Sequence, residues 1–156
     1  MTAFGWSASD IVAAIKITSR VCGAFKDAGG AASKYNQAVD FLTGFRTTLN
    51  HIQRFTESCS EDIYSRDIQD QLKKIANPWK SFEGFLTAYE KSLGEQSTRS
   101  RLKKVRRTIQ WTLQDLSGEV EKLKVAVVQP LQVINSLLSL QLLYARSRLM
   151  SNCYWI

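Results

Sequence analysis

Apolar residues recur at three- and four-residue steps along most of the chain, which is the spacing of one face of an α-helix. The clearest case covers residues 61–93, where the apolar positions step by 4, 3, 4, 3, 4, 3 and 4. These positions are Ile68, Leu72, Ile75, Trp79, Phe82, Leu86, Tyr89 and Leu93. A strict seven-residue repeat predicts a helix that packs along a neighbour, as in a four-helix bundle. Because Pro78 lies inside the repeat, we expect a kink near residues 76–77.

Two further helices precede this repeat. The first is expected over residues 8–28, because Ser7 followed by Asp10 forms a capping-box pattern that marks a helix start. A glycine pair ends it. The second is expected over residues 32–56. Its apolar stripe consists of Tyr35, Val39, Leu42, Phe45, Leu49 and Ile52.

Towards the C-terminus the spacing predicts a short basic helix over residues 99–113, a joint at 113–118 and a last helix over 119–149, bent near Pro130. The buried face of the last helix is expected to hold Val120, Leu123, Val127, Leu131, Ile134, Leu138 and Leu142. Residues 125–145 carry no charge and are long enough to span a bilayer. A polar stripe opposite the apolar one favours a bundle helix instead. That stripe consists of Gln129, Gln132, Ser136 and Ser139.

Together these helices predict an all-α fold, an antiparallel bundle of four to five helices that forms a single domain over residues 1–156. A chain of 156 residues is long enough to bury one core without disulfides or metals. Two prolines and eight glycines are too few for a protein built from strands and tight turns.

The sequence is poor in catalytic chemistry. His51 is the only histidine and Cys22, Cys59 and Cys153 are widely spaced, so neither a zinc site nor a disulfide framework is expected. No phosphate-binding loop or hydrolase motif occurs. We therefore expect no catalytic residue, metal or cofactor, and hence a protein that is not an enzyme. Reduced thiols and the lack of a signal-peptide pattern predict a cytoplasmic location.

Charge is concentrated near the end of the chain. Residues 1–98 are neutral overall, whereas residues 99–156 hold ten Lys and Arg against three Asp and Glu and account for the net charge of +7. Six cations form a basic cluster without acids: Arg99, Arg101, Lys103, Lys104, Arg106 and Arg107. Such a cluster indicates a surface that faces acidic phospholipid, nucleic acid or a nuclear-import receptor; the alternative is a solvated basic helix on the bundle. No aromatic residue interleaves the cluster, which disfavours single-stranded nucleic acid.

The first helix is a second candidate for a binding role. Phe4 and Trp6 precede it, and aromatic side chains suit a membrane interface. Small residues along it allow close helix approach in water or in lipid. They are Ala13, Ala14, Gly23 and Ala24. The alternative is that this helix is simply the central core helix of the bundle.

Several segments of the chain match the pattern of a known family. The opening FGWSASDIVAAI (4–15) and FKDA (25–28), together with residues 102–113, 119–123 and 133–138, resemble fungal N-terminal domains that precede nucleotide-binding oligomerisation modules of NLR-like or STAND proteins. The later segments are similar to the basic tryptophan-containing segment and the closing helix of those domains. The resemblance covers residues 4 to about 143.

This resemblance implies a helical bundle akin to HeLo-like and mixed-lineage-kinase-like domains, whose members are effectors of programmed cell death in heterokaryon incompatibility and innate immunity. In the better understood relatives, oligomerisation releases the N-terminal helix to attack the plasma membrane. Carried over to this chain, the basic cluster attracts anionic lipid. The membrane-active residues become Phe4, Trp6, Ile11, Val12, Ile15, Ile17 and Val21.

Two features depart from the family. The chain contains no phosphate loop or nucleotide-binding module, so we expect a stand-alone domain or the product of a truncated gene. Lys16 and Arg20 lie within the first helix, and each costs about 2.5–3.5 kcal/mol at the centre of a bilayer on insertion scales. Insertion of this helix is therefore expected to be shallow or oligomeric.

The leading hypothesis is a non-enzymatic effector module that acts by oligomerisation and membrane contact, cytoplasmic until activation recruits it to the plasma membrane. Its expected partners are further copies of itself or a nucleotide-binding receptor, together with an anionic membrane surface. Two alternatives stay open. One is a protein-interaction domain that relays a signal without touching membranes, and the less favoured one is a basic nucleic-acid-binding module.

Overall fold

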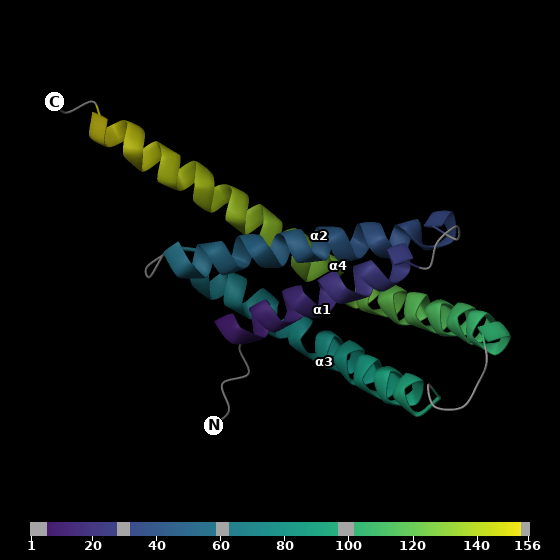
Figure 1. Ribbon diagram of the computed structural model, residues 1–156. Coiled ribbons are helices and arrows are strands. Elements are labelled where there is room, and N and C mark those ends of the chain that lie inside the picture. Colours follow the sequence, from purple (N-terminus) through teal and green to yellow (C-terminus); the bar gives the residue numbers. More distant parts are fainter. Residues whose placement is uncertain (1–5, 28–31, 59–62, 97–101, 154–156) are drawn as a thin grey trace, which may run out of the picture.

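The computed structural model describes residues 6–27, 32–58, 63–96 and 102–153, and every regular element within them is an α-helix. The helices are α1 (Ala8–Asp27), α2 (Ala32–Ser58), α3 (Ser65–Gln96) and α4 (Leu102–Cys153). α1 and α2 form one antiparallel pair, α3 and α4 form another, and α4 also packs against α2 (Figure 1). The expectation of an all-α bundle is thus confirmed.

The core is built from the apolar stripes of the four helices. On α2 the stripe is buried from Leu42 to Ile52, and on α3 the seven-residue repeat is buried from Ile68 to Leu86. Each fully buried side chain of this size contributes about 1.5–3 kcal/mol relative to an exposed one. Burial of the predicted apolar stripes therefore stabilises these long helices, whose other faces are rich in polar residues.

α1 begins with the predicted capping box. The backbone N–H of Ser7 donates to Oδ2 of Asp10 at 2.8 Å, and the backbone N–H of Asp10 donates to Oγ of Ser7 at 3.3 Å. These reciprocal bonds satisfy two backbone donors that the first helical turn leaves free. The hydrogen bonds from Ser7 also lower the pKa of the Asp10 carboxyl below its ordinary value.

The predicted division of the C-terminal third into two helices with a joint at residues 113–118 is wrong. α4 is one helix of 52 residues. Leu113, Leu116 and Val120 are all buried at steps of three and four, so the core-facing stripe continues through the expected joint. Gly118 lies on the exposed side of this turn, where a glycine costs only about 1 kcal/mol of helix propensity.

Both prolines lie inside helices, Pro78 in α3 and Pro130 in α4. The apolar repeat keeps its phase across Pro78, because Ile75 before it and Trp79 after it are both buried. The kink near Pro78 and the bend near Pro130 stay predictions. Both helices continue beyond their prolines.

Thr48 makes a polar contact between α2 and α4. The hydroxyl of Thr48, a buried residue of α2, donates to Oδ1 of Asn135 on α4 at 3.2 Å. Ile134 beside it is fully buried, whereas the large apolar residues from Leu140 onwards are exposed. The Thr48–Asn135 contact therefore lies close to the place where α4 leaves the bundle.

Candidate membrane-contact surface

The structure places most of the predicted membrane-active residues inside the bundle. Ile11 and Val21 of α1 are buried, and their neighbours on the same helix are partly buried. The partly buried residues are Val12, Ile15 and Ile17. Phe4 lies outside the described residues. Contact with lipid through these side chains of α1 would require the helix to leave the core.

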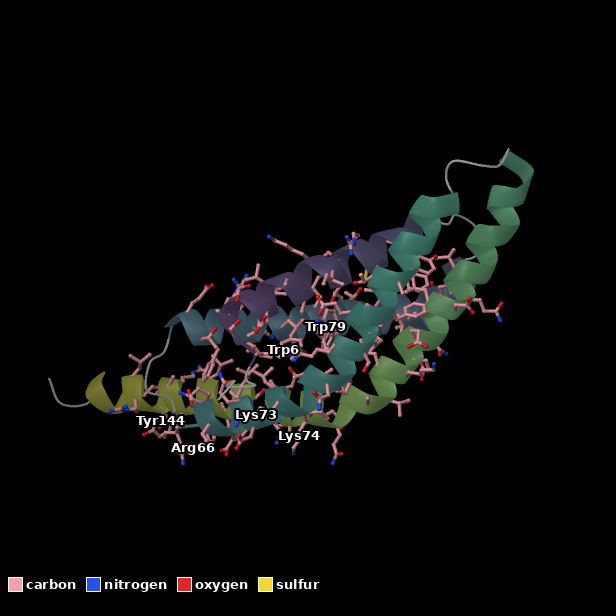
Figure 2. All side chains as sticks on the ribbon, turned by 90° about the horizontal axis from the view of Figure 1, so that it is seen from below. Trp6, Arg66, Lys73, Lys74, Trp79 and Tyr144 are labelled. Carbon is pink, nitrogen blue, oxygen red and sulfur yellow. The ribbon has the colours of Figure 1, made fainter. Side chains whose placement is uncertain are left out.

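Trp6 packs the start of α1 against α3. Its side chain is 7% exposed and meets the ring of Trp79 edge to face, with ring centroids 5.9 Å apart and planes at 76° (Figure 2). Trp79 also contacts Phe45 of α2 and Phe82 of α3, both with centroids 5.6 Å apart. An edge-to-face pair is worth about 0.5–1.5 kcal/mol beyond the area it buries. These four rings, the aromatic cluster, therefore hold three helices together.

The basic cluster lies at the N-terminal end of α4. Arg99 and Arg101 lie outside the described residues. The other four cations fall on the first turns of the α4 backbone, and their side chains lie outside the described part of the chain. These four are Lys103, Lys104, Arg106 and Arg107. Anion binding by this cluster stays a prediction.

The exposed apolar surface lies at the opposite end of α4. After crossing α2, this helix continues past the rest of the bundle towards the C-terminus (Figure 1). We call residues 140–150 the projecting end. Its exposed apolar side chains are Leu140 (46%), Leu142 (74%), Leu143 (64%), Tyr144 (42%), Leu149 (69%) and Met150 (54%). The prediction that Leu142 faces the core is wrong, because this side chain is 74% exposed, although Gln141 beside it is still buried at 8%.

The apolar residues of the projecting end cover a wide arc of the helix. At about 100° per residue, Leu142, Leu143 and Leu140 span about 160°, and Tyr144 extends the arc to about 200°, with Arg146 and Ser147 of the next turn inside it. The opposite side continues the line of Ile134 and consists mainly of polar or small residues. The arc therefore faces away from the bundle and is wider than the stripe of about 100° that a core-facing helix needs.

The charged side chains that follow Glu121 in the sequence are all positive. Glu121 is the last acidic residue of the sequence, and Lys122 and Lys124 are paired with Glu119 and Glu121 on the same helix. Arg146 and Arg148 have no acidic partner among the described residues. The guanidinium of Arg148 lies over the ring of Tyr144, 6.0 Å from its centroid. An apolar surface is thus combined with two available cations.

Further cations come from the first half of α3. Arg66, Lys73 and Lys74 are exposed and lie near the lower edge of the molecule in Figure 2; Tyr144 overlaps this region in that view, but Figure 1 shows the projecting end of α4 diverging from the start of α3. Lys73 donates to Asp70 at 2.8 Å and lowers the pKa of that carboxyl. This edge therefore holds both acids and bases, in contrast to the acid-free projecting end.

The signal for the projecting end was present in the sequence as the uncharged residues 125–145. Among the described residues, one helical stretch, Leu113–Met150, is long and apolar enough to cross a membrane by length and composition, and 28% of its apolar window is buried. The polar stripe was predicted to lie opposite the apolar one, and it is exposed. Assignment of the stretch to the bundle holds through Ile134, the partly buried Leu137 and Leu138, and the buried side chain of Gln141.

Metal-binding chemistry is not assembled in the described part of the chain. No group of three or more His, Cys, Asp or Glu side chains there is placed to hold a metal ion. His51 is exposed on α2, and Cys22 is buried as a free thiol. The candidate functional feature among the described residues is therefore the apolar and cationic surface of the projecting end.

Comparison of the chain with protein-family models, curated proteins and solved structures finds no match. The resemblance to fungal effector domains thus rests on the quoted segments alone. Since helical bundles serve many unrelated roles, a functional conclusion has to come from the surface of this particular bundle.

Proposed function

We propose that this chain is a non-enzymatic helical-bundle module that binds anionic membrane surfaces and self-associates there, as its resemblance to fungal cell-death effector domains implies. The observation that supports this most strongly is the projecting end of α4. It exposes large apolar side chains next to Arg146 and Arg148, in a part of the sequence that has no acidic residue after Glu121.

The size of the exposed surface is sufficient for membrane binding. Leu142, Leu143 and Leu149 are each more than 60% exposed, and moving three leucines out of water is worth about 5–9 kcal/mol if burial is complete. Each cation close to an anionic surface adds about 1 kcal/mol. Immobilising the protein on the membrane offsets several kcal/mol of this gain. We therefore expect dissociation constants in the micromolar range, since 1 μM corresponds to about 8 kcal/mol.

The charge distribution supports an anionic rather than a neutral membrane. All of the net charge of +7 lies in residues 99–156, which form α4 and its flanks. The basic cluster at one end of α4 and the two arginines at the other both favour acidic headgroups. Because exposed charges are screened within about 8 Å at physiological salt, binding should weaken as salt concentration rises.

A signal-relay domain without membrane activity is the second candidate. It is favoured by the burial of Ile11 and Val21, which leaves α1 integrated in a closed bundle. In that case the projecting end would bind a partner protein. Vesicle binding separates the two candidates, because a relay domain has no reason to prefer acidic lipid.

The test is co-sedimentation of the folded protein with vesicles of phosphatidylcholine alone or mixed with phosphatidylserine. We expect binding to the mixed vesicles only, weakened by added salt, and a larger assembly on them by chemical cross-linking. The double variant K103Q/K104Q should bind less well, while the matched control K16Q/K26Q on exposed positions of α1 should bind like the wild type. Folded protein that ignores mixed vesicles would refute the proposal, and a salt-sensitive complex with duplex DNA in its place would favour nucleic-acid binding.

A further inference from the structure

We infer that the projecting end of α4, and not α1, is the element that enters the lipid layer, while the rest of the bundle stays closed. The inference rests on the proposed membrane function and specifies which residues meet the lipid. It follows from the contrast between a helix that is buried and a helix end that is already exposed.

α1 is held in the core at several points. Ile11 is 1% exposed and Phe25 is 2% exposed, while Trp6 contacts Trp79 edge to face. Releasing α1 would expose these side chains to water before any of them reaches lipid. By contrast, Leu142 and Leu143 meet water in the closed bundle, so their insertion gains free energy without breaking any core contact.

The shape of the apolar arc points to lipid as its occupant. A second helix packed alongside covers a stripe of about 100°, whereas the arc from Leu142 to Tyr144, which is apolar apart from Arg146 and Ser147, spans about 200°. Lipid chains adapt to such a wide arc because they surround whatever part of the helix enters the bilayer. The arc also faces away from the bundle, so the rest of the molecule does not block its approach to a surface.

The polar residues of the projecting end suit the headgroup region of an anionic membrane. Arg146 and Arg148 have long side chains that can reach headgroup phosphates while their stems remain among apolar groups. Tyr144 has the amphipathic ring that favours the membrane–water boundary. No acidic side chain follows Glu121, so nothing in this part of the chain is repelled by acidic lipid.

The length of the projecting end limits the depth of insertion. Eleven helical residues extend about 16 Å, roughly half of the apolar thickness of a bilayer. The preceding residues Val127, Leu131 and Ile134 are buried against the bundle and are not available to lipid. The geometry therefore predicts shallow insertion into one leaflet rather than a helix that spans the membrane.

The first test compares two double variants on the same helix. L142E/L143E changes the projecting end, and V125E/V128E introduces the same charge at exposed positions within the bundle body. Because all four side chains are exposed, both variants should keep the wild-type circular dichroism spectrum and unfolding midpoint. We expect binding to phosphatidylserine-containing vesicles to fall at least tenfold for L142E/L143E and less than twofold for V125E/V128E.

The second test places an environment-sensitive fluorophore (NBD) on a single cysteine. The three native cysteines are first replaced by Cys22→Ala, Cys59→Ser and Cys153→Ser. The label is then attached to Leu143→Cys or, as a control, to Ala13→Cys, an exposed position on α1. Mixed vesicles should shift the emission of the Leu143→Cys probe to the blue and leave that of the Ala13→Cys probe unchanged.

The outcomes separate this inference from the proposed function. If the wild type binds mixed vesicles and L142E/L143E binds equally well, or if only the Ala13→Cys probe responds, the inference is overturned while membrane binding stands. Loss of self-association by L142E/L143E with vesicle binding intact would assign the arc to a second copy and would also overturn it. If the wild type does not bind mixed vesicles, the proposed function fails and the inference falls with it.

Discussion

Replacing Trp79 by alanine should be among the most damaging single changes in this bundle. The side chain is 4% exposed and contacts the rings of Trp6, Phe45 and Phe82. Truncation of a buried tryptophan costs about 3–5 kcal/mol through lost burial and the cavity left behind. Because Trp79 joins three helices, we expect Trp79→Ala to lie towards the upper end of that range. A domain of this size has about 5–15 kcal/mol of stability in total, so the variant is left marginal.

Urea unfolding followed by far-ultraviolet circular dichroism measures this loss. The midpoint should fall while the slope with urea stays unchanged, which shows that stability has changed rather than the compactness of either state. Trp79→Phe, which keeps a ring at the centre, should lose less. Val125→Ala at a 70% exposed position is the matched control and should stay within about 0.5 kcal/mol of the wild type. A loss below about 2 kcal/mol for Trp79→Ala would refute the central place given to this ring.

The same variant also tests which element carries the proposed membrane binding. If release of α1 were the route into lipid, loosening the Trp6–Trp79 contact should increase binding to phosphatidylserine-containing vesicles. With the projecting end as the inserted element, Trp79→Ala should bind as the wild type does at temperatures where it is folded. Stronger vesicle binding by the folded variant would therefore argue for α1.

Three further predictions follow from polar contacts. Ser7→Ala removes the cap of α1 and should lower the free energy of unfolding by about 0.5–2 kcal/mol, and unchanged thermal unfolding would contradict the role of the capping box. Because hydrogen bonds from Ser7 lower the pKa of Asp10, the stability they provide is complete above the ordinary pKa and is lost as the pH falls through the lower pKa of the folded state. Unfolding of Asp10→Asn should thus depend less on pH in the acid range than that of the wild type, and parallel curves would rule this out. Thr48→Val removes the donor to Asn135 and should cost about 0.5–1.5 kcal/mol in urea unfolding, whereas a variant as stable as the wild type would show that the bond is worth no more than one to water.

The interior of the bundle was largely predictable because helical periodicity is a local property of the sequence. Leu42 and Phe45 on α2, and Leu72 and Phe82 on α3, were placed on core-facing stripes by their spacing, and all four are buried. The capping box at Ser7 was equally local, since its two partners lie three residues apart. These features do not depend on how the helices are arranged.

The place where α4 leaves the bundle was not predictable from spacing. Ile134 and Leu142 lie on the same predicted stripe, yet their exposed fractions are 0% and 74%. The difference arises because α4 crosses α2 near Thr48 and then diverges from it, so that Leu142 no longer faces a neighbouring helix (Figure 1). The position and direction of a helix crossing are tertiary quantities that a stripe does not encode.

Trp6 shows a second limit of the sequence pattern. An aromatic residue just before an apolar helix fits a membrane interface and a protein core equally well, because both accept a large ring with one polar group. The structure places Trp6 in the core, against Trp79. Only the position of α3, which lies far away in the sequence, distinguishes the two environments.

The acid-free stretch after Glu121 limits how pH can change the charge of the projecting end. Residues 122–156 contain no aspartate, glutamate or histidine, which are the side chains that ordinarily gain protons as a compartment acidifies from neutral pH. The far end of α4 therefore keeps the same electrical character in the cytosol and in an acidified vesicle. A pH dependence of the proposed membrane binding would therefore have to arise from His51 and the acidic residues earlier in the chain, or from the lipid.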